Sequence, residues 1–83
     1  MASLAFVAGG ERRSLPAEEV EEVLPMAALS ADGHLLLRGH RLPVRAPGGK
    51  LPGPGGYILI VRAGGLREGL AVDDVIGVET EAP

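Results

Sequence analysis

Glutamates and histidines are the side chains of this sequence whose types and spacing could do chemistry. Glu18, Glu21 and Glu22 lie three and four residues apart, and carboxylates held close together can act as general acid and base. Such a role requires burial that raises the pKa of one carboxyl group, and nothing in the sequence around them would provide it. His34 and His40 lie six residues apart without a third ligand nearby, whereas a metal site needs three or four converging groups. We therefore interpret the glutamates as a solvated surface and expect no metal ion.

A glycine-lysine segment at residues 48–51 matches a phosphate-binding loop only in part. The position five residues before Gly49 is Val44 instead of glycine, and Leu51 replaces the serine or threonine that would bind magnesium. The chain has no cysteine, few hydroxyl side chains and no acid-histidine arrangement that would activate one of them. We therefore expect no nucleotide, no cofactor and no catalytic residue, and the chain is not predicted to be an enzyme.

Basic side chains are concentrated in the middle of the chain. Residues 33–67 contain six of them and no acidic residue, while the remainder has two arginines against eleven acidic residues, so that the net charge is −3. The interpretation we favour is that folding brings the basic middle and the acidic ends together as a compensating surface. The alternative is a contact face for an acidic partner or a polyanion. The six residues are Arg38, Arg41, Arg45, Lys50, Arg62 and Arg67.

Length and composition predict one small, turn-rich domain. The 83 residues include 13 glycines and 7 prolines, and 46% are hydrophobic but only 2% aromatic, so the core must consist of aliphatic side chains. The absence of cysteine fits a reducing compartment, and the apolar start of the chain has neither the length of a membrane span nor a basic flank. We therefore expect a cytoplasmic protein.

The sequence pattern predicts mainly β-structure with one or two short helical turns. Alternating apolar residues, glycine pairs and prolines mark the boundaries, and Pro43 is expected at an edge or a bulge. The expected elements are strands at residues 3–8 and 11–15 around Gly9-Gly10, a short acidic helix at residues 16–24, strands at residues 34–38 and 41–46 joined at Gly39-His40, a Pro/Gly linker at residues 46–56, strands at residues 57–62 and 66–72 around Gly64-Gly65, one helical turn at residues 73–77, and a strand from Val78.

The chain contains an internal repeat with an offset of 55 residues. Residues 8–23 align with residues 63–78 without a gap, and seven of the sixteen positions are identical. The acidic pair Glu18-Glu19 also matches Asp73-Asp74. Each copy is expected to contain a strand, a glycine hairpin, a second strand, a short acidic helical turn and a valine. Because two copies are too few for a solenoid, we expect a pseudo-symmetric β-barrel or sandwich.

Three motifs, in this order and spacing, resemble the CheW-like domains of chemotaxis coupling proteins. They are GGERRSLPAEEVEEVLP at residues 9–25, Leu37-Arg38-Gly39 followed by Leu42-Pro43-Val44, and Gly69-Leu70 followed by Val72-Asp73, Val75 and Gly77-Val78. Two family positions differ, since Leu36 stands where asparagine is usual and Ala46 where aspartate is usual. The family's last strands have no counterpart before Pro83. The resemblance implies a single, shortened CheW-like domain over residues 1–83, built as SH3-like β-barrels.

The resemblance also implies a function, which is that of a non-catalytic adaptor between a CheA-type histidine kinase and a chemoreceptor or receptor-like protein. The family's receptor contact, or the support of that surface, falls at Arg38 and Gly39. The kinase-binding face, an apolar patch on one barrel, falls at Val20, Val75, Gly77 and Val78, for which core packing is the other interpretation.

Alternative functions and an assembly state remain open from the sequence. One alternative is a basic β-barrel that binds nucleic acid, although Tyr57 is the one aromatic residue in the basic segment that could stack on a base. Another is a degenerate CheW-like paralogue that has lost one partner. Because missing strands would leave exposed sheet edges, we also expect either a homodimer or a barrel completed by a partner, with a single closed barrel in a monomer as the simpler option.

Overall fold

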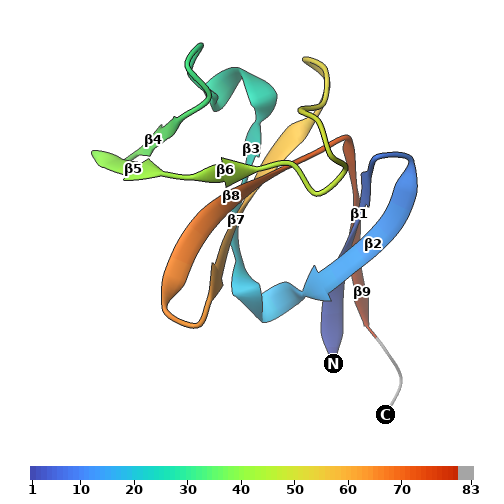
Figure 1. The fold of residues 1–83 in the computed structure, drawn as a ribbon. Coiled ribbons are helices and arrows are strands. Elements are labelled where there is room, and N and C mark those ends of the chain that lie inside the picture. The colour runs from blue at the N-terminus through green and yellow to red at the C-terminus, as the bar shows by residue number, and fades with distance from the viewer. Residues whose placement is uncertain (81–83) are drawn as a thin grey trace.

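The computed structural model describes residues 1–80, and these are almost entirely β-structure (Figure 1). The elements are β1 (Ala2–Ala8), β2 (Glu11–Pro16), the 3₁₀-helix η1 (Ala17–Glu19), β3 (Val20–Pro25), the 3₁₀-helix η2 (Met26–Ala28), β4 (Leu35–Leu37), β5 (His40–Leu42), β6 (Val44–Arg45), β7 (Tyr57–Ala63), β8 (Leu66–Val72) and β9 (Asp74–Thr80). This confirms the predicted mainly β class, although of the one or two predicted helical turns only the first has a counterpart, at η1, and η2 was not predicted. Among residues 1–80 there is no helix long and apolar enough to cross a membrane.

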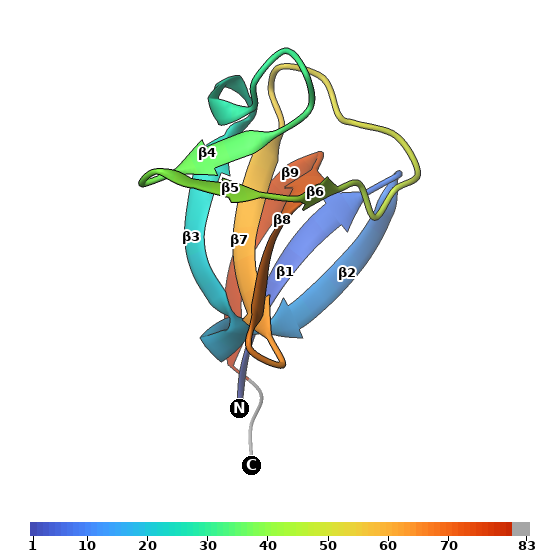
Figure 2. The same ribbon diagram turned by 60° about the vertical axis from the view of Figure 1, so that its left-hand side comes forward.

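The strands form three sheets stacked in layers. A three-stranded sheet has the order β2-β1-β9, a four-stranded sheet has the order β3-β7-β8-β6, and β4 and β5 form a separate hairpin. The two larger sheets face each other, and the β4–β5 hairpin crosses the outer face of β3 and β7 (Figures 1 and 2). Over residues 1–80 these sheets do not close into a β-barrel, which the sequence analysis expected as the alternative to a sandwich.

The internal repeat appears in the structure as an exchange of third strands. Each copy forms its own hairpin, β1–β2 or β7–β8, and both have a two-residue glycine turn with positive φ at each glycine. However, β3 pairs with β7 of the second copy, and β9 pairs with β1 of the first copy. The registers of the two exchanged strands correspond. Val20 lies opposite Val61, and Val75 lies opposite Phe6. The repeat offset of 55 residues relates Val20 to Val75 and Phe6 to Val61. The repeat is therefore a pseudo-two-fold arrangement of two interlocked halves.

Two hydrophobic cores lie on opposite faces of the four-stranded sheet. The first core fills the space between the two larger sheets and contains Phe6, Leu59, Val61, Leu70 and Val72, among others. The second core lies between the four-stranded sheet and the β4–β5 hairpin, and its buried members are Leu35, Leu42, Ile58 and Ile60. Because β7 alternates its side chains between both cores, its residues 58–61 are continuously apolar instead of alternating.

Two predicted helical segments are strands in the structure. After a single 3₁₀ turn at Ala17–Glu19, the chain continues as β3, and residues 73–77 contain a bend at Asp73 followed by β9. Local signals for helices, namely Pro16 and the acidic pairs, are real but short-ranged. Pairing with a strand of the other repeat copy, far away in the sequence, gives each segment backbone partners that no local pattern reveals.

The middle of the chain differs from the prediction by one residue at its turn. Arg38 and Gly39 form the two-residue turn of the β4–β5 hairpin, so the strands join there and not at Gly39-His40. Pro43 interrupts the second predicted strand and divides it into β5 and β6. Its carbonyl oxygen accepts a 2.8 Å hydrogen bond from Gly69 N–H, and β6 then pairs in parallel with β8. Pro43 thus sits at a break in the strand, as expected of a residue without an N–H.

The Pro/Gly linker contains no strand but packs against the β1–β2 turn. A Cβ atom at Gly48 would lie only 2.8 Å from the Cα atom of Gly9, a distance that real Cβ contacts do not show. We predict that Gly48→Ala lowers the free energy of unfolding by about 1–3 kcal/mol, because the linker or the turn must shift. Urea denaturation of the wild type and the variant measures this difference.

Gly53→Ala is the matched control for this prediction. Gly53 lies in the same linker, a Cβ atom added there would meet no neighbour within 4 Å, and the position needs no positive φ. We expect Gly53→Ala to be neutral or to stabilise by up to about 1 kcal/mol through the unfolded chain. Equal stability of the two alanine variants would mean that the linker does not press against the hairpin.

Candidate protein-binding site

An open seam runs between β3 and β9, which are the edge strands of the two larger sheets. It contains a cavity of about 280 Å³. The apolar lining residues come from four elements that are distant in sequence: Leu4 of β1, Ala17 of η1, Val20 and Val23 of β3, and Val78 of β9. Val23 and Val78 are equivalent positions of the repeat, and both are substantially exposed, at 46% and 64%. The seam is therefore an apolar, solvent-accessible surface of about the size of one or two side chains.

Four of the predicted site residues lie on these two strands. Val20 and Val75 are partly buried and pack against the first core, while Val78 is exposed in the seam. Gly77 has a φ of 141° and follows Ile76, the extra residue of a β-bulge opposite β1. Val20 and Val78 thus line the same cavity, whereas Val75 and Gly77 shape β9 beside it.

β3 has a bulge at the repeat position that is equivalent to the bulge of β9. Its extra residue is a glutamate, whereas the extra residue of β9 is Ile76. Glu21 is the extra residue opposite β7, and its oxygens lie 2.8 Å from Arg67 Nε and 3.6 Å from Arg62 Nε. The Arg67 guanidinium, through its hydrogen bond, holds the pKa of Glu21 below its ordinary value. Glu21 therefore stays ionised and ties the seam to the β7–β8 hairpin.

The predicted arginine site is connected to this seam. Arg38 is the one non-glycine residue with positive φ in residues 1–80, at 50°, and Gly39 follows it at 81°. Positive φ at both central residues is what a type I′ hairpin turn requires. The Arg38 guanidinium pairs with Glu22, a half-buried residue of β3 that itself lines the seam. The structure thus brings Arg38 and the valines of β3 together through Glu22.

Several contributors to this site could not be named from the sequence. Glu22 belongs to the glutamate cluster that the sequence analysis interprets as a solvated surface, and that analysis assigns no binding role to Leu4, Ala17 or Val23. The signal available in the sequence was the repeat, because Val23 and Val78 are equivalent within it. What the repeat did not reveal is that strand exchange makes both of them edge residues.

The basic residues of the middle segment are compensated in the fold. Five of the six lie within 4 Å of a carboxylate, and Lys50 is the exception among residues 1–80. The pairs are Arg38–Glu22, Arg41–Asp32, Arg45–Glu68, Arg62–Glu21 and Arg67–Glu21. This arrangement agrees with the interpretation of a mutually compensating surface and leaves no stripe of unpaired positive charge along the described part of the chain.

A serine, an aspartate and a histidine meet at the turn before β4, but not as a catalytic triad. The Ser30 hydroxyl donates to Asp32 Oδ1 and not to a histidine nitrogen, and His34 Nδ1 lies 3.4 Å from the same carboxylate oxygen. Arg41 Nη2 donates to Asp32 Oδ2 at 3.3 Å. Within residues 1–80, no cluster of three or more His, Asp or Glu side chains could hold a metal ion. The hydrogen bonds among Ser30, Asp32 and His34 therefore stabilise the turn that precedes β4.

The architecture built from these elements is the CheW-like fold. Among solved structures, the chain is similar to the crystal structure of the scaffolding protein TtCheW from Thermoanaerobacter tengcongensis, with a TM-score of 0.79 and 24% sequence identity. The match covers 98% of this chain and 62% of that chain, so the chain spans less than two thirds of the length of the scaffolding protein. No protein-family model and no curated protein matches the sequence.

The hydrogen bonds at the Ser30 turn predict an unusually acidic carboxyl group. The Ser30 hydroxyl, and then the His34 backbone N–H, lower the pKa of Asp32 from 3.8 to about 2. A lowered pKa in the folded state means that ionised Asp32 favours folding above its unfolded-state value, and that this contribution is lost as the pH falls toward 2. Carboxyl-carbon NMR should give a midpoint near 2, and Ser30→Ala should raise it. A midpoint at an ordinary aspartate value in the wild type would contradict the hydrogen bond.

Proposed function

We propose that this chain is a non-catalytic scaffold of a chemotaxis-type signalling pathway that couples a CheA-type histidine kinase to a receptor or receptor-like protein. The CheW-like fold supports the proposal, and the observation that carries it is the apolar seam between β3 and β9. Such a role requires two protein-binding surfaces and no cofactor. It would place the chain in the cytoplasm, where the kinase acts.

The seam is the proposed kinase-binding surface. Its exposed valines lie at the free edges of two sheets, where both an apolar side chain and a strand edge are available to a partner. The partly buried Val20 and Val75 hold this surface against the first core, and Gly77 permits the bulge that orients Val78. Core packing and binding are therefore divided between neighbouring residues of the same strands.

The Arg38-Gly39 turn is the proposed receptor-side contact. Holding an arginine at positive φ costs roughly 1–2 kcal/mol relative to glycine, and such strain is often found at functional positions. The Arg38 side chain is 66% exposed although it pairs with Glu22. Its planar guanidinium can therefore take a second carboxylate or carbonyl partner.

Nucleic-acid binding finds no comparable support. The arginines that would contact phosphates are paired with carboxylates in the fold, and within residues 1–80 an aromatic platform for base stacking is not present beside them. A degenerate scaffold that binds one of the two partners remains an outcome of the two experiments below, which test the surfaces separately.

The kinase surface is tested by Val78→Arg. Because Val78 is 64% exposed, the substitution should leave the fold intact, whereas a charge at Val75 would also disturb the core. We expect calorimetric titration with the regulatory domain of a CheA-type kinase to show saturable binding by the wild type. For Val78→Arg we expect affinity to fall at least roughly tenfold, which corresponds to about 1.4 kcal/mol.

The matched control for this titration is Leu51→Arg, at a 50% exposed leucine in the Pro/Gly linker. It introduces the same charge outside the seam and should bind the kinase domain like the wild type. Equal loss in both variants would indicate a nonspecific effect of charge. An absence of binding by the folded wild type would refute the kinase role.

The receptor surface is tested by Arg38→Asn. Asparagine is favoured in type I′ turns, so relief of the positive-φ strain should offset the lost exposed ion pair and leave the melting temperature unchanged or higher. We expect this variant to lose binding to the signalling tip of a receptor while it keeps binding to the kinase domain. Arg38→Lys, which keeps the charge but not the planar fork, should be intermediate. Full receptor binding by Arg38→Asn would remove Arg38 from the proposed contact.

A further inference from the structure

The outer edge of β2 is a free sheet edge. In the three-stranded sheet β2 pairs with β1 on one side, and within residues 1–80 no strand pairs with its other side. The equivalent strand of the second repeat copy, β8, differs in this respect, because β6 pairs with its outer edge. The repeat therefore shows how an added strand would meet β2.

The backbone of β2 has the same orientation as the backbone of β8. Gly69 of β8 donates its N–H to the carbonyl oxygen of Pro43 at 2.8 Å, directly before β6 begins. The repeat offset relates Gly69 to Ser14 of β2. Both hairpins have the same two-glycine turn and the same register, so the Ser14 N–H also points away from the hairpin. An added strand can accept this hydrogen bond as the residue before β6 accepts that of Gly69.

The side chains at the equivalent positions of the two edges have opposite charges. Glu68 of β8 forms a 2.8 Å ion pair with Arg45 of β6, the added strand. The equivalent residue of β2 is Arg13. Within residues 1–80, the one carboxylate within 4 Å of the Arg13 guanidinium is that of Glu11, at 3.9 Å, and the buried Arg13 Nε–H has no hydrogen-bond partner. Because a buried donor without an acceptor is unfavourable, Arg13 lacks a partner of the kind that Glu68 has.

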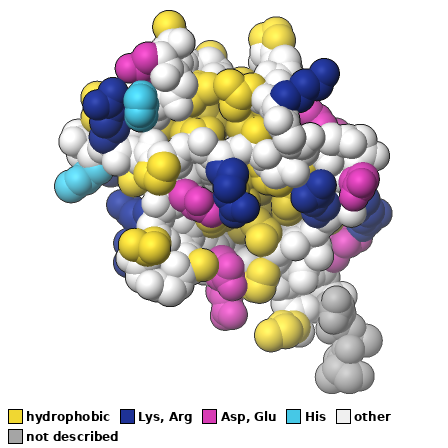
Figure 3. Space-filling view, in the orientation of Figure 1, with side chains coloured by type: hydrophobic (Ala, Val, Ile, Leu, Met, Phe, Trp, Pro, Cys, Tyr) yellow, Lys and Arg dark blue, Asp and Glu magenta, His cyan; other side chains and the backbone are white. Residues whose placement is uncertain are grey.

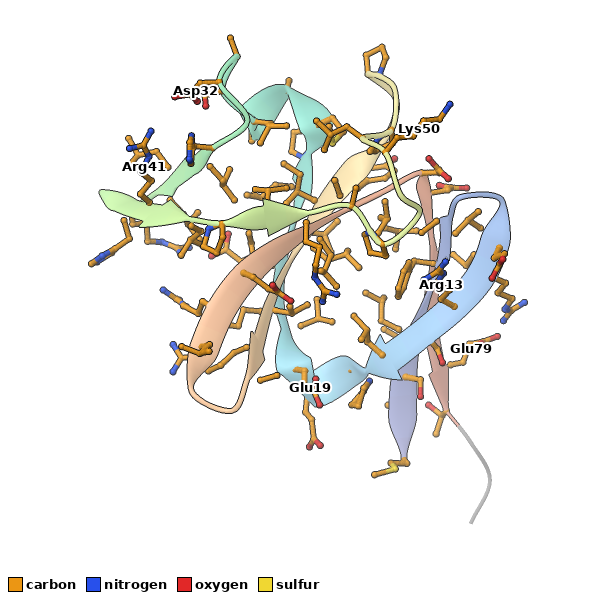
Figure 4. The ribbon with its side chains drawn as sticks, viewed as in Figure 1. Arg13, Glu19, Asp32, Arg41, Lys50 and Glu79 are labelled. Atoms are coloured by element: carbon orange, nitrogen blue, oxygen red, sulfur yellow. The ribbon has the colours of Figure 1, made fainter. Side chains whose placement is uncertain are left out.

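The first core is open beside this edge. Arg13 lies opposite Phe6, so its side chain is on the first-core side of the sheet. Figure 3 shows apolar side chains in the opening between β8 and β2 with charged side chains around it, and a cavity of about 370 Å³ beside β8 is lined in part by Val61 and Glu68. Figure 4 places Arg13 at β1 and β2, with Lys50 of the linker above it in this view. This side of the molecule therefore favours an occupant with negative charge.

We propose that the outer edge of β2 binds an extended segment of a partner protein, which runs parallel to β2 and places a carboxylate against Arg13. The direction follows from β6, which is parallel to β8. The position of the carboxylate follows from Arg45, which lies opposite Leu70, so the acidic residue of the partner would lie opposite Leu15. Backbone hydrogen bonds would supply affinity, and the acidic side chain would supply specificity.

The proposed edge is separate from the seam between β3 and β9, and a second copy of this chain fits it less well. β2 lies at the opposite end of its sheet from β9, so both surfaces can be occupied together. Two β2 edges related by a two-fold axis would run antiparallel, whereas the β6–β8 pair is parallel. The glutamates of the edge strands β3 and β9 are held in ion pairs within the chain. A partner with an unpaired carboxylate on an extended segment is therefore the better occupant.

Two synthetic peptides test the proposal. Each is blocked at both ends and alternates threonine with valine, and the central residue is glutamate in one peptide and lysine in the other. Added to ¹⁵N-labelled protein up to about 1 mM, the glutamate peptide should shift the amide signals of Arg13 and Ser14 and slow the hydrogen exchange of Ser14. The amide signal of Val78, in the seam, should stay in place. The lysine peptide should bind at least roughly tenfold more weakly.

Substitutions on β2 provide the matched controls. Arg13→Glu gives β2 the charge that β8 has at Glu68, so this variant should prefer the lysine peptide by a similar factor. Arg13→Gln, which introduces no negative charge, should lose the preference and serves as a second variant if Arg13→Glu does not fold. Arg12→Gln removes a charge from the other face of the same strand, where Arg12 pairs with Glu79, and should bind both peptides like the wild type.

Four results would overturn the proposal. One is equal affinity of the wild type for the two peptides, and another is a peptide-induced shift of Val78 without a shift of Ser14. A third is an absence of binding of the glutamate peptide at about 1 mM. The fourth is a shift of Ser14 when the protein alone is concentrated, which would mean that a second copy occupies the edge in place of an acidic partner.

Discussion

The reciprocal exchange of β3 and β9 is the constraint on which the rest of this structure depends. Because each hairpin takes its third strand from the other half of the chain, neither half can form its sheet alone. The exchange also produces the two cores, since it places β7 in the middle of the molecule with apolar side chains on both faces. It leaves β3 and β9 as edges, and the candidate binding surface is the space between those edges.

Much of the fold could be predicted from the sequence because its signals are local. Glycine pairs marked two of the three hairpins, the alternation of apolar residues marked β1, and Pro43 marked a break in a strand. The errors fall where a local signal competed with a distant partner. Both acidic segments were predicted as helical turns, and both lead into strands whose pairing partners lie far away in the sequence.

The candidate site was predictable as a set of residues but not as a surface. The motifs singled out Arg38 and the spaced valines, yet the sequence could not place Arg38 beside Glu22, because that ion pair joins a hairpin turn to an edge strand across the second core. Nor could it separate Val78, which is exposed, from Val75, which packs against the core. Exposure at an edge strand depends on strand order, which periodicity does not encode.

The β1–β9 pairing also determines when this protein can fold during its synthesis. The β1–β2 hairpin is made well before β9, the strand that completes its sheet. Until β7 and β8 of the opposing sheet are also made, Leu4 and Phe6, which are buried in the finished protein, have no apolar surface to cover them. The first core therefore forms only after strands that are distant in sequence have been made, whereas a protein with locally paired hairpins can bury apolar side chains as each hairpin forms.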